Sequence, residues 1–311
     1  MKEEENAGLR QMLTGEKAKT GEGMSKPYGL AVYHGRVFVS DSMLHKVLVF
    51  DIPGQSFYHI GDDEEGTLGK PMGLDLDGKG QLYVVDALFK TVKVYDKDGK
   101  YLRKFGDSKM LVRPIGIAVD AAGSRAYVVD SGGVSSQEHR VRVFDAQTGA
   151  HLMDIGKRGN GQGEFNFPID ATLGLDGLLY VVDSANFRVQ VFRPDGTFVR
   201  TFGSIGAKGG NFARPKEIAT DPEGNVYVVD TAFGNFQIFT PEGELLMAVG
   251  SRSEKGGMAK FMLPSGLAID GDGRVYMSDQ YFRKIDVFRP AKLAEGEGFT
   301  AINKDAEPAA K

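Results

Sequence analysis

The chain has 311 residues, of which 41% are hydrophobic and 42 are glycines, and its formal net charge is −4. It contains no cysteine, which excludes disulfides, thiolate metal sites and a cysteine nucleophile. The small negative charge gives no global attraction to nucleic acid. No apolar run approaches the roughly 18–20 residues needed to span a bilayer, so no transmembrane segment is expected. Residues 1–8 are acidic and polar, unlike a signal peptide.

One sequence unit recurs six times along the chain. Each unit opens with a proline and a short apolar stretch, passes through a glycine turn, and reaches an aspartate after a second apolar stretch. An aromatic residue follows nine residues after the aspartate in every unit except the third, where Phe144 comes later because residues 132–140 carry an insertion. We expect that insertion to project as a loop and to tolerate shortening. The prolines are Pro27, Pro71, Pro114, Pro168, Pro215 and Pro264, and the aspartates are Asp41, Asp86, Asp130, Asp183, Asp230 and Asp279.

Each unit contains four short stretches typical of β-strands. In the third unit these are residues 117–120, 126–130, 141–144 and the segment between Gly149 and Gly156. Short β-branched and aromatic runs between glycine, proline and aspartate turns indicate strands. A repeat of about 40–50 residues with four strands is typical of a propeller blade. The sequence therefore predicts an all-β, six-bladed β-propeller with four-stranded blades.

The sixth unit lacks its fourth strand, and the N-terminus offers a replacement. Five units end in a segment bounded by two glycines seven residues apart, whereas the sixth stops at Pro290. The same spacing occurs between Gly8 and Gly15. We therefore expect residues 8–15 to complete the last blade and close the ring, which removes open sheet edges. This gives one domain over residues 1–290 and a mobile tail over residues 291–311.

The units resemble the NHL-repeat family. The fourth unit carries the family pattern almost letter for letter in its Tyr-Val-Val-Asp (180–183), Asn-Phe-Arg-Val-Gln-Val-Phe (186–192) and Thr-Phe-Gly (201–203) stretches, and the resemblance extends over residues 8–290. It implies the propeller fold but not one activity, because the fold supports many. The family includes RNA-binding domains of tripartite-motif proteins, sensor domains of bacterial kinases and many exported bacterial proteins. The resemblance thus points to a bacterial, exported protein and leaves the compartment open. Peptidylglycine amidating lyase has a similar propeller with a channel metal. None of the five histidines here falls on an innermost strand, so that activity is not expected.

The strand order predicts two different faces. The loops after the six aspartates and the loops that lead to the prolines share one rim, and the short glycine turns lie on the other. Six symmetric aspartates are expected to be structural, accepting loop N–H groups and pairing with a base five residues on in three units (Lys46, Arg188, Lys284).

Departures from the repeat mark the candidate site. Asp170 and Glu217 replace a glycine found in the other four units, and Asp75 replaces an alanine. These positions belong to the innermost strands, so the three carboxylates are expected at the mouth and wall of the central channel. Oxygen ligands suit Ca²⁺, which is the only cofactor suggested. The competing interpretation is that Lys216, or water, neutralises the carboxylates.

The rim carries apolar side chains that serve packing between blades or a partner site. Those assigned to ligand binding, together with Asp170, Lys216 and Glu217, are Phe89, Phe187, Phe233 and Phe282. The basic rim loops are interpreted as a solvated, mixed surface. We predict a non-enzymatic binding propeller that engages a protein or small ligand through the rim, with no catalytic residue assigned. The alternatives are a divalent-metal lyase or hydrolase in the channel, and, less favoured, a single-stranded RNA-binding protein.

Overall fold

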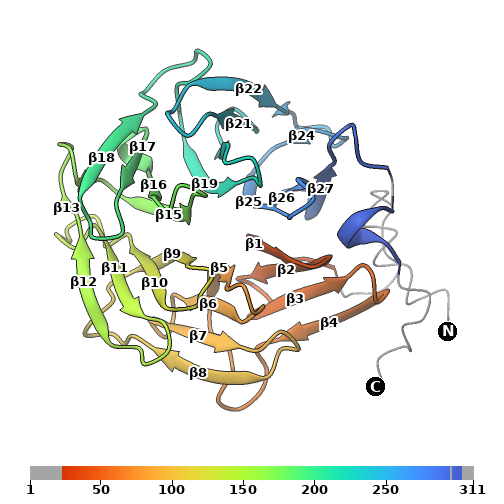
Figure 1. Ribbon diagram of the computed structural model, residues 1–311, viewed down its shortest axis with the longest axis horizontal. Helices are drawn as coiled ribbons and strands as arrows, with labels where there is room; N and C mark the ends of the chain where they lie inside the picture. The colour runs from red at the N-terminus through yellow and green to blue at the C-terminus, as the bar shows by residue number, and fades with distance from the viewer. Residues whose placement is uncertain (1–22, 295, 303–311) are drawn as a thin grey trace.

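The computed structural model describes residues 23–294 and 296–302, which form a ring of six antiparallel sheets around a central channel (Figure 1). Within these residues five sheets have four strands and the sixth has three. The prediction of a six-bladed, all-β propeller is therefore confirmed. The predicted strand over residues 8–15 lies outside the described residues.

The first three blades follow one pattern, in which successive strands run from the channel outwards. Blade one contains β1 (Pro27–Tyr33), β2 (Arg36–Asp41), β3 (Lys46–Asp51) and β4 (Ser56–Ile60). Blade two contains β5 (Pro71–Leu76), β6 (Leu82–Asp86), β7 (Thr91–Tyr95) and β8 (Tyr101–Phe105). Blade three contains β9 (Pro114–Val119), β10 (Arg125–Asp130), β11 (Arg140–Asp145) and β12 (His151–Ile155).

The last three blades repeat the pattern. Blade four contains β15 (Pro168–Leu173), β16 (Leu179–Asp183), β17 (Arg188–Phe192) and β18 (Phe198–Phe202). Blade five contains β19 (Pro215–Thr220), β20 (Val226–Asp230), β21 (Asn235–Phe239) and β22 (Leu245–Val249). Blade six contains β25 (Pro264–Ile269), β26 (Val275–Asp279) and β27 (Lys284–Phe288).

Short elements lie between and after the blades. Two pairs of two-residue parallel strands lie in the rim loops, one 3-10 helix lies in the β16–β17 turn of blade four, and another follows blade six. The strand pairs are β13 (Lys157–Arg158) with β14 (Glu164–Phe165), and β23 (Ser251–Arg252) with β24 (Lys260–Phe261). The helices are η1 (Ser184–Asn186) and η2 (Gly298–Thr300).

The core lies between neighbouring blades. Valines and aromatics on the second and third strands, such as Val181, Val191 and Phe239, are buried in apolar clusters that two neighbouring blades share. Each repeat unit therefore cannot bury its apolar face alone, and stacking around the ring buries it. This packing fixes the six inner strands, and with them the side chains that line the channel.

The repeat aspartates organise the rim as predicted. The proline that opens each inner strand pairs in register with the aspartate of the second strand, for example Pro168 with Asp183. The Asp86 carboxylate accepts hydrogen bonds from the backbone N–H groups of Gly69, Lys70, Leu88 and Phe89, at 2.6–3.1 Å. One carboxylate thus holds both rim loops of its blade.

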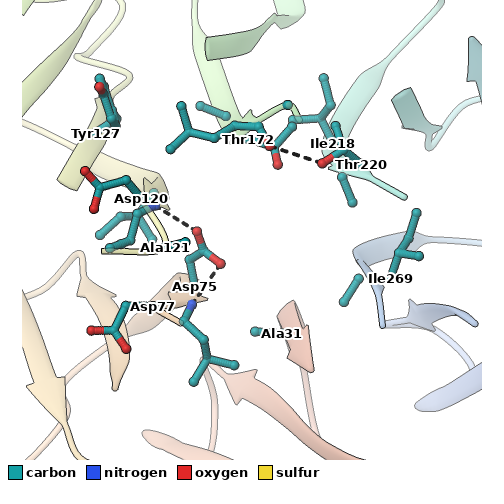
Figure 2. A pocket seen from close by; sticks show the side chains of 18 of the residues that line it. Ala31, Asp75, Asp77, Asp120, Ala121, Tyr127, Thr172, Ile218, Thr220 and Ile269 are labelled. Atoms are coloured by element: carbon teal, nitrogen blue, oxygen red, sulfur yellow. Dashed lines mark hydrogen bonds between the residues drawn. The ribbon is translucent and has the colours of Figure 1, made fainter. Parts of the chain in front are cut away.

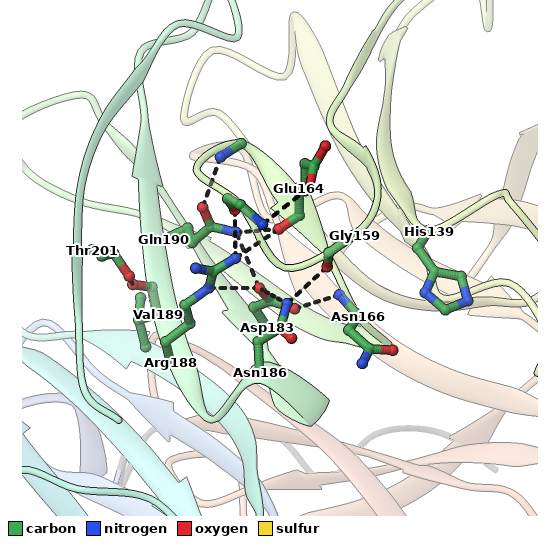
Figure 3. A network of polar contacts seen from close by, with 12 residues as sticks. His139, Gly159, Glu164, Asn166, Asp183, Asn186, Arg188, Val189, Gln190 and Thr201 are labelled. Carbon is green, nitrogen blue, oxygen red and sulfur yellow. Dashed lines mark hydrogen bonds and ion pairs between the residues drawn. The ribbon is translucent and has the colours of Figure 1, made fainter. Parts of the chain in front are cut away.

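The predicted base five residues after the aspartate pairs in only one of three blades. In blade four, Arg188 donates to Asp183 at 2.8 Å within a larger polar network (Figure 3). Lys46 instead pairs with Asp62, and Lys284 pairs with Asp286. Asp62 follows the neighbouring outer strand β4, and Asp286 lies two residues from Lys284 on the same strand β27. Other acids therefore compete for each lysine, and the spacing alone does not determine the partner.

Part of the predicted C-terminal tail packs on the propeller. The backbone N–H of Phe299 donates to Asp272 at 2.6 Å, and its ring lies 4.8 Å from the His34 ring, edge to face. Arg274 also donates to the carbonyl of Glu297. Residues 296–302 therefore cover turns of blades six and one.

Candidate functional site

A cavity of about 720 Å³ occupies the central channel. All six inner strands line it, and the lining continues onto short turns of blades two, three and four, which include Gly78, Ala121 and Gly174. The cavity therefore opens on the face of the short glycine turns, opposite to the rim loops. Figure 2 shows its walls, with Asp75, Asp77 and Asp120 on one side and Thr172, Thr220 and Ile269 on the other.

Asp170 and Glu217 lie at the end of the cavity furthest from the short turns. Both residues stand two positions after the proline that opens their strand. In the other four inner strands the first described residue that lines the cavity stands three positions after the proline. Both are buried, at 6% and 5% exposure. The sequence predicted them at the mouth and wall of the channel, and the structure places them in the wall, at the end of the cavity towards the rim loops.

The two carboxyl groups form one hydrogen-bonded pair across blades four and five. Asp170 Oδ2 also accepts the backbone N–H of Ile218 at 3.2 Å. Burial raises the pKa of Asp170 to about 7. Burial and then the charge of Asp170 raise the pKa of Glu217 well above its usual value. Because two buried carboxylates so close cannot both ionise at little cost, the pair holds a proton at neutral pH.

Gly116 of blade three makes room for this pair. A Cβ atom added there would lie 2.6 Å from Asp170 Oδ1 and 2.5 Å from the carbonyl oxygen of Ile169. Any side chain at this position would displace the Asp170 carboxyl or the β15 backbone.

Asp75 lines the same cavity but is held by the backbone. Its Oδ1 accepts the N–H of Leu76 and its Oδ2 accepts the N–H of Val119, both at 2.8 Å. Burial raises the pKa of Asp75 to about 7 despite these bonds. Among the described residues no group of three or more acidic, histidine or cysteine side chains is arranged to hold a metal ion. Calcium binding by Asp75, Asp170 and Glu217 therefore stays a prediction from the sequence.

Lys216 and Tyr28 lie one residue nearer to the rim and do not line the cavity. The Lys216 ammonium lies 4.2 Å from the centre of the Tyr28 ring, in a cation–π contact. Burial lowers the pKa of Lys216 to about 8, Glu217 opposes this shift, and Arg214 and Lys26 add to it. Sequence reasoning missed Tyr28, although an aromatic directly before Gly29 distinguishes this inner strand from the other five.

The four predicted rim phenylalanines do not form one cluster. Phe89 is 48% exposed, whereas Phe187 packs against the core between blades four and five, and Phe233 and Phe282 are half-buried. No ring-to-ring contact joins these four within the described part of the chain. Packing between blades thus accounts for Phe187, while Phe89 is available to a partner.

A ring of basic side chains surrounds the rim end of the channel. Lys26, Lys70, Arg113 and Arg214 each precede the proline of an inner strand, are exposed, and form no ion pair with any described residue. Four of six repeats have a base at this position, a signal that a column-by-column comparison of the repeats would have shown. By contrast, Lys157, in the basic rim loop that leads to blade four, pairs with Glu164.

The fold defines the class: this is a six-bladed β-propeller, and one of its blades matches a known repeat family. Residues 165–192, in blade four, match the NHL repeat family model. No curated protein matches the sequence. No helix among the described residues has the length and apolar character to cross a membrane.

Solved structures share the fold at low sequence identity. A protein of unknown function from Bacteroides thetaiotaomicron matches with a TM-score of 0.69 and 18% identity, over 87% of this chain and 70% of that one. A gluconolactonase from Xanthomonas campestris matches with a TM-score of 0.63 and 16% identity, over 86% and 88%. A chain of a nidogen/laminin complex matches with a TM-score of 0.59 and 18% identity, over 72% and 80%. These likenesses show the fold alone.

Proposed function

We propose that the protein is a non-enzymatic binding propeller whose rim loops engage a protein partner. The observation that carries this proposal is a set of exposed apolar side chains on the rim turns of blades six, one and two. They are Tyr281 (58% exposed), Met43 (61%), Leu44 (36%), Leu88 (61%) and Phe89 (48%). Large apolar side chains displayed on loops of a rigid scaffold are typical of binding surfaces.

The backbone of the turns that carry these side chains is held in place by the repeat aspartates. The Asp41 carboxylate accepts the N–H groups of Met43 and Leu44, both at 3.0 Å. Asp86 does the same for Leu88 and Phe89, and Asp279 for Tyr281. Preordered turns reduce the entropy lost when a partner binds.

The basic ring indicates which chemical groups the partner should carry. Lys26, Lys70, Arg113 and Arg214 give the rim around the channel a local positive charge, although the whole chain carries −4. A protein segment with acidic residues beside apolar ones would complement both features. The nidogen/laminin neighbour shows that this fold occurs in a protein–protein complex.

Single-stranded RNA is the second candidate, because the same basic ring could contact phosphates. Such binding would weaken steeply with salt. The alternative of a metal enzyme with its site in the channel has less support. Among the described acids, Asp170 and Glu217 form a pair and Asp75 is held separately by backbone N–H groups, so the three do not form a metal cluster.

Affinity capture from an extract of the source organism tests the proposal, using tagged full-length protein. The rim variants are Leu88→Ser with Phe89→Ser, and Arg113→Glu with Arg214→Glu. The control is Leu102→Ser with Leu152→Ser, two side chains that are 42% and 47% exposed on outer strands. We expect a protein captured by the wild type and the control but lost with both rim variants, also after nuclease treatment. Capture that is equal for all variants would contradict a rim site, and capture lost with nuclease would favour RNA.

A further inference from the structure

We propose that the central channel is a second, independent binding site, for a small organic cation with an ammonium group on an apolar body. It would enter from the short-turn face and place its ammonium against Asp170 and Glu217. The cavity of about 720 Å³ falls within the range of roughly 300–1,000 Å³ typical of small-molecule sites.

The charge of the lining favours a cation. Five acidic residues line the cavity, whereas Arg125 is the only basic side chain among its described lining residues. The acids are Asp75, Asp77, Asp120, Asp170 and Glu217. Arg125 lies at the mouth, where its Nη1 donates to the carbonyl of Pro194 at 3.3 Å. An anion would therefore meet five carboxyl groups and a single basic side chain at the mouth.

Glu217 lacks the partners that a buried carboxyl group usually has. It is 5% exposed, and Asp170 is its only hydrogen-bond partner among the described residues. Lys216, directly before it, lies over the Tyr28 ring on the rim side. Buried polar groups are normally satisfied by several donors, so the cavity side of this carboxyl pair suits a ligand that brings N–H groups.

The wall between the acids and the mouth has slightly more apolar than polar surface. Leu30, Leu74, Ile117, Ile218 and Leu267 line it together with alanines. Such a wall suits a hydrocarbon or aromatic body rather than a hydrated metal ion. Asp75 already uses both oxygens on backbone N–H groups, which also makes an organic ammonium a better fit than a metal that needs several free oxygens.

Calorimetric titration of the full-length protein with benzylammonium tests the inference, with benzyl alcohol and benzoate as neutral and anionic probes of similar shape. We expect benzylammonium to bind at least 10-fold more tightly than either. Asp170→Asn should weaken benzylammonium at least 10-fold, and its amide oxygen can still accept the N–H of Ile218. Thr172→Leu, which narrows the cavity without altering the acids, should also weaken binding.

The matched control is Glu242→Gln, an exposed acid in the turn between β21 and β22 on the short-turn face. It should bind benzylammonium as the wild type does. Equal binding of benzylammonium and benzyl alcohol would overturn the inference, as would equal weakening by Asp170→Asn and Glu242→Gln. Displacement of the amine by millimolar Ca²⁺ would assign the carboxyl groups to a metal instead.

Discussion

Asp170 and Glu217, at equivalent positions of neighbouring inner strands, share a hydrogen bond between their carboxyl groups. The other four blades have glycine at this position. One of these glycines, Gly116, packs directly against Asp170. The propeller therefore breaks its own symmetry at one place in the channel, and it does so with buried acids.

This pair predicts a defined pH dependence of stability. An unfolded aspartate has a pKa of about 3.9, and burial raises that of Asp170 to about 7. Between these values the folded state holds more protons, so this contribution to stability is complete below about pH 4 and is lost as pH rises through 7. Asp170→Asn should flatten the fall in the free energy of unfolding between pH 5 and 8, measured with urea. A slope identical to that of the wild type and of Glu242→Gln would contradict the shared proton.

The glycine beside the pair is expected to be intolerant of substitution. Gly116→Ala would place a Cβ atom 2.5–2.7 Å from Ile169 and Asp170, so it should destabilise the protein by about 1–3 kcal/mol. Gly133→Ala is the matched control, since no atom lies within 4 Å of its added Cβ. Thermal or urea unfolding of both variants measures the difference in stability. Equal stabilities would contradict the prediction and show that the inner strands shift freely.

Calcium separates the two interpretations of the channel acids. The sequence-based metal site predicts a higher melting temperature with Ca²⁺ than with chelator, through mass action. The arrangement seen here, with Lys216 beside a proton-sharing pair, predicts equal melting temperatures and a loss of stability in Lys216→Ala. Calorimetry with Ca²⁺ and with chelator distinguishes them, and a Ca²⁺-dependent rise that Asp170→Ala abolishes would restore the metal site.

The insertion in blade three is expected to be only partly dispensable. His139 is fully buried, its Nδ1 accepts the N–H of Phe167 at 3.1 Å, and its Nε2 contacts the carbonyl of Gly133 at 3.2 Å. His139→Ala should cost about 1–3 kcal/mol, because it leaves a buried N–H without a partner. Removal of the exposed Val134 and Ser135 should cost little. Unfolding curves measure both, and a harmless His139→Ala would restore the expectation that the whole insertion can be shortened.

The outer strands of neighbouring blades differ in how they contact the next blade, and blade six differs most in its strand number. Arg103 and Arg200, on β8 and β18, reach carbonyl groups of the next blade. Met247 holds the matching position on β22 and is 53% exposed. Within the described residues blade six has three strands, so its outer strand β27 pairs on one side only. Deleting residues 1–16 should therefore lower the melting temperature and promote aggregation through open edges. A truncated protein that melts like the full chain would contradict closure by residues 8–15.

The fold was predictable because its signals repeat. Each proline, glycine turn and aspartate recurs six times, so a strand that is ambiguous in one unit can be assigned from the other five. The site was only partly predictable. Asp170 and Glu217 stood out as departures from the repeat, but burial and a shared hydrogen bond depend on how neighbouring blades pack. Lys46 and Lys284 show the same limit, since each pairs with an acid other than the repeat aspartate, Asp62 after the adjacent strand and Asp286 on the same strand. The role of His139 depended on contact with Phe167, 28 residues away.

Hydrogen exchange of the protein with its captured partner tests the central claim most directly, because it maps the bound surface on the intact chain. We predict slowed exchange in the rim turns over residues 42–45, 87–90 and 280–283 and around Lys26 and Arg214. The short turns near residues 78 and 174 should exchange as in the free protein. Protection confined to those short turns, with unchanged rim turns, would contradict a rim-binding propeller.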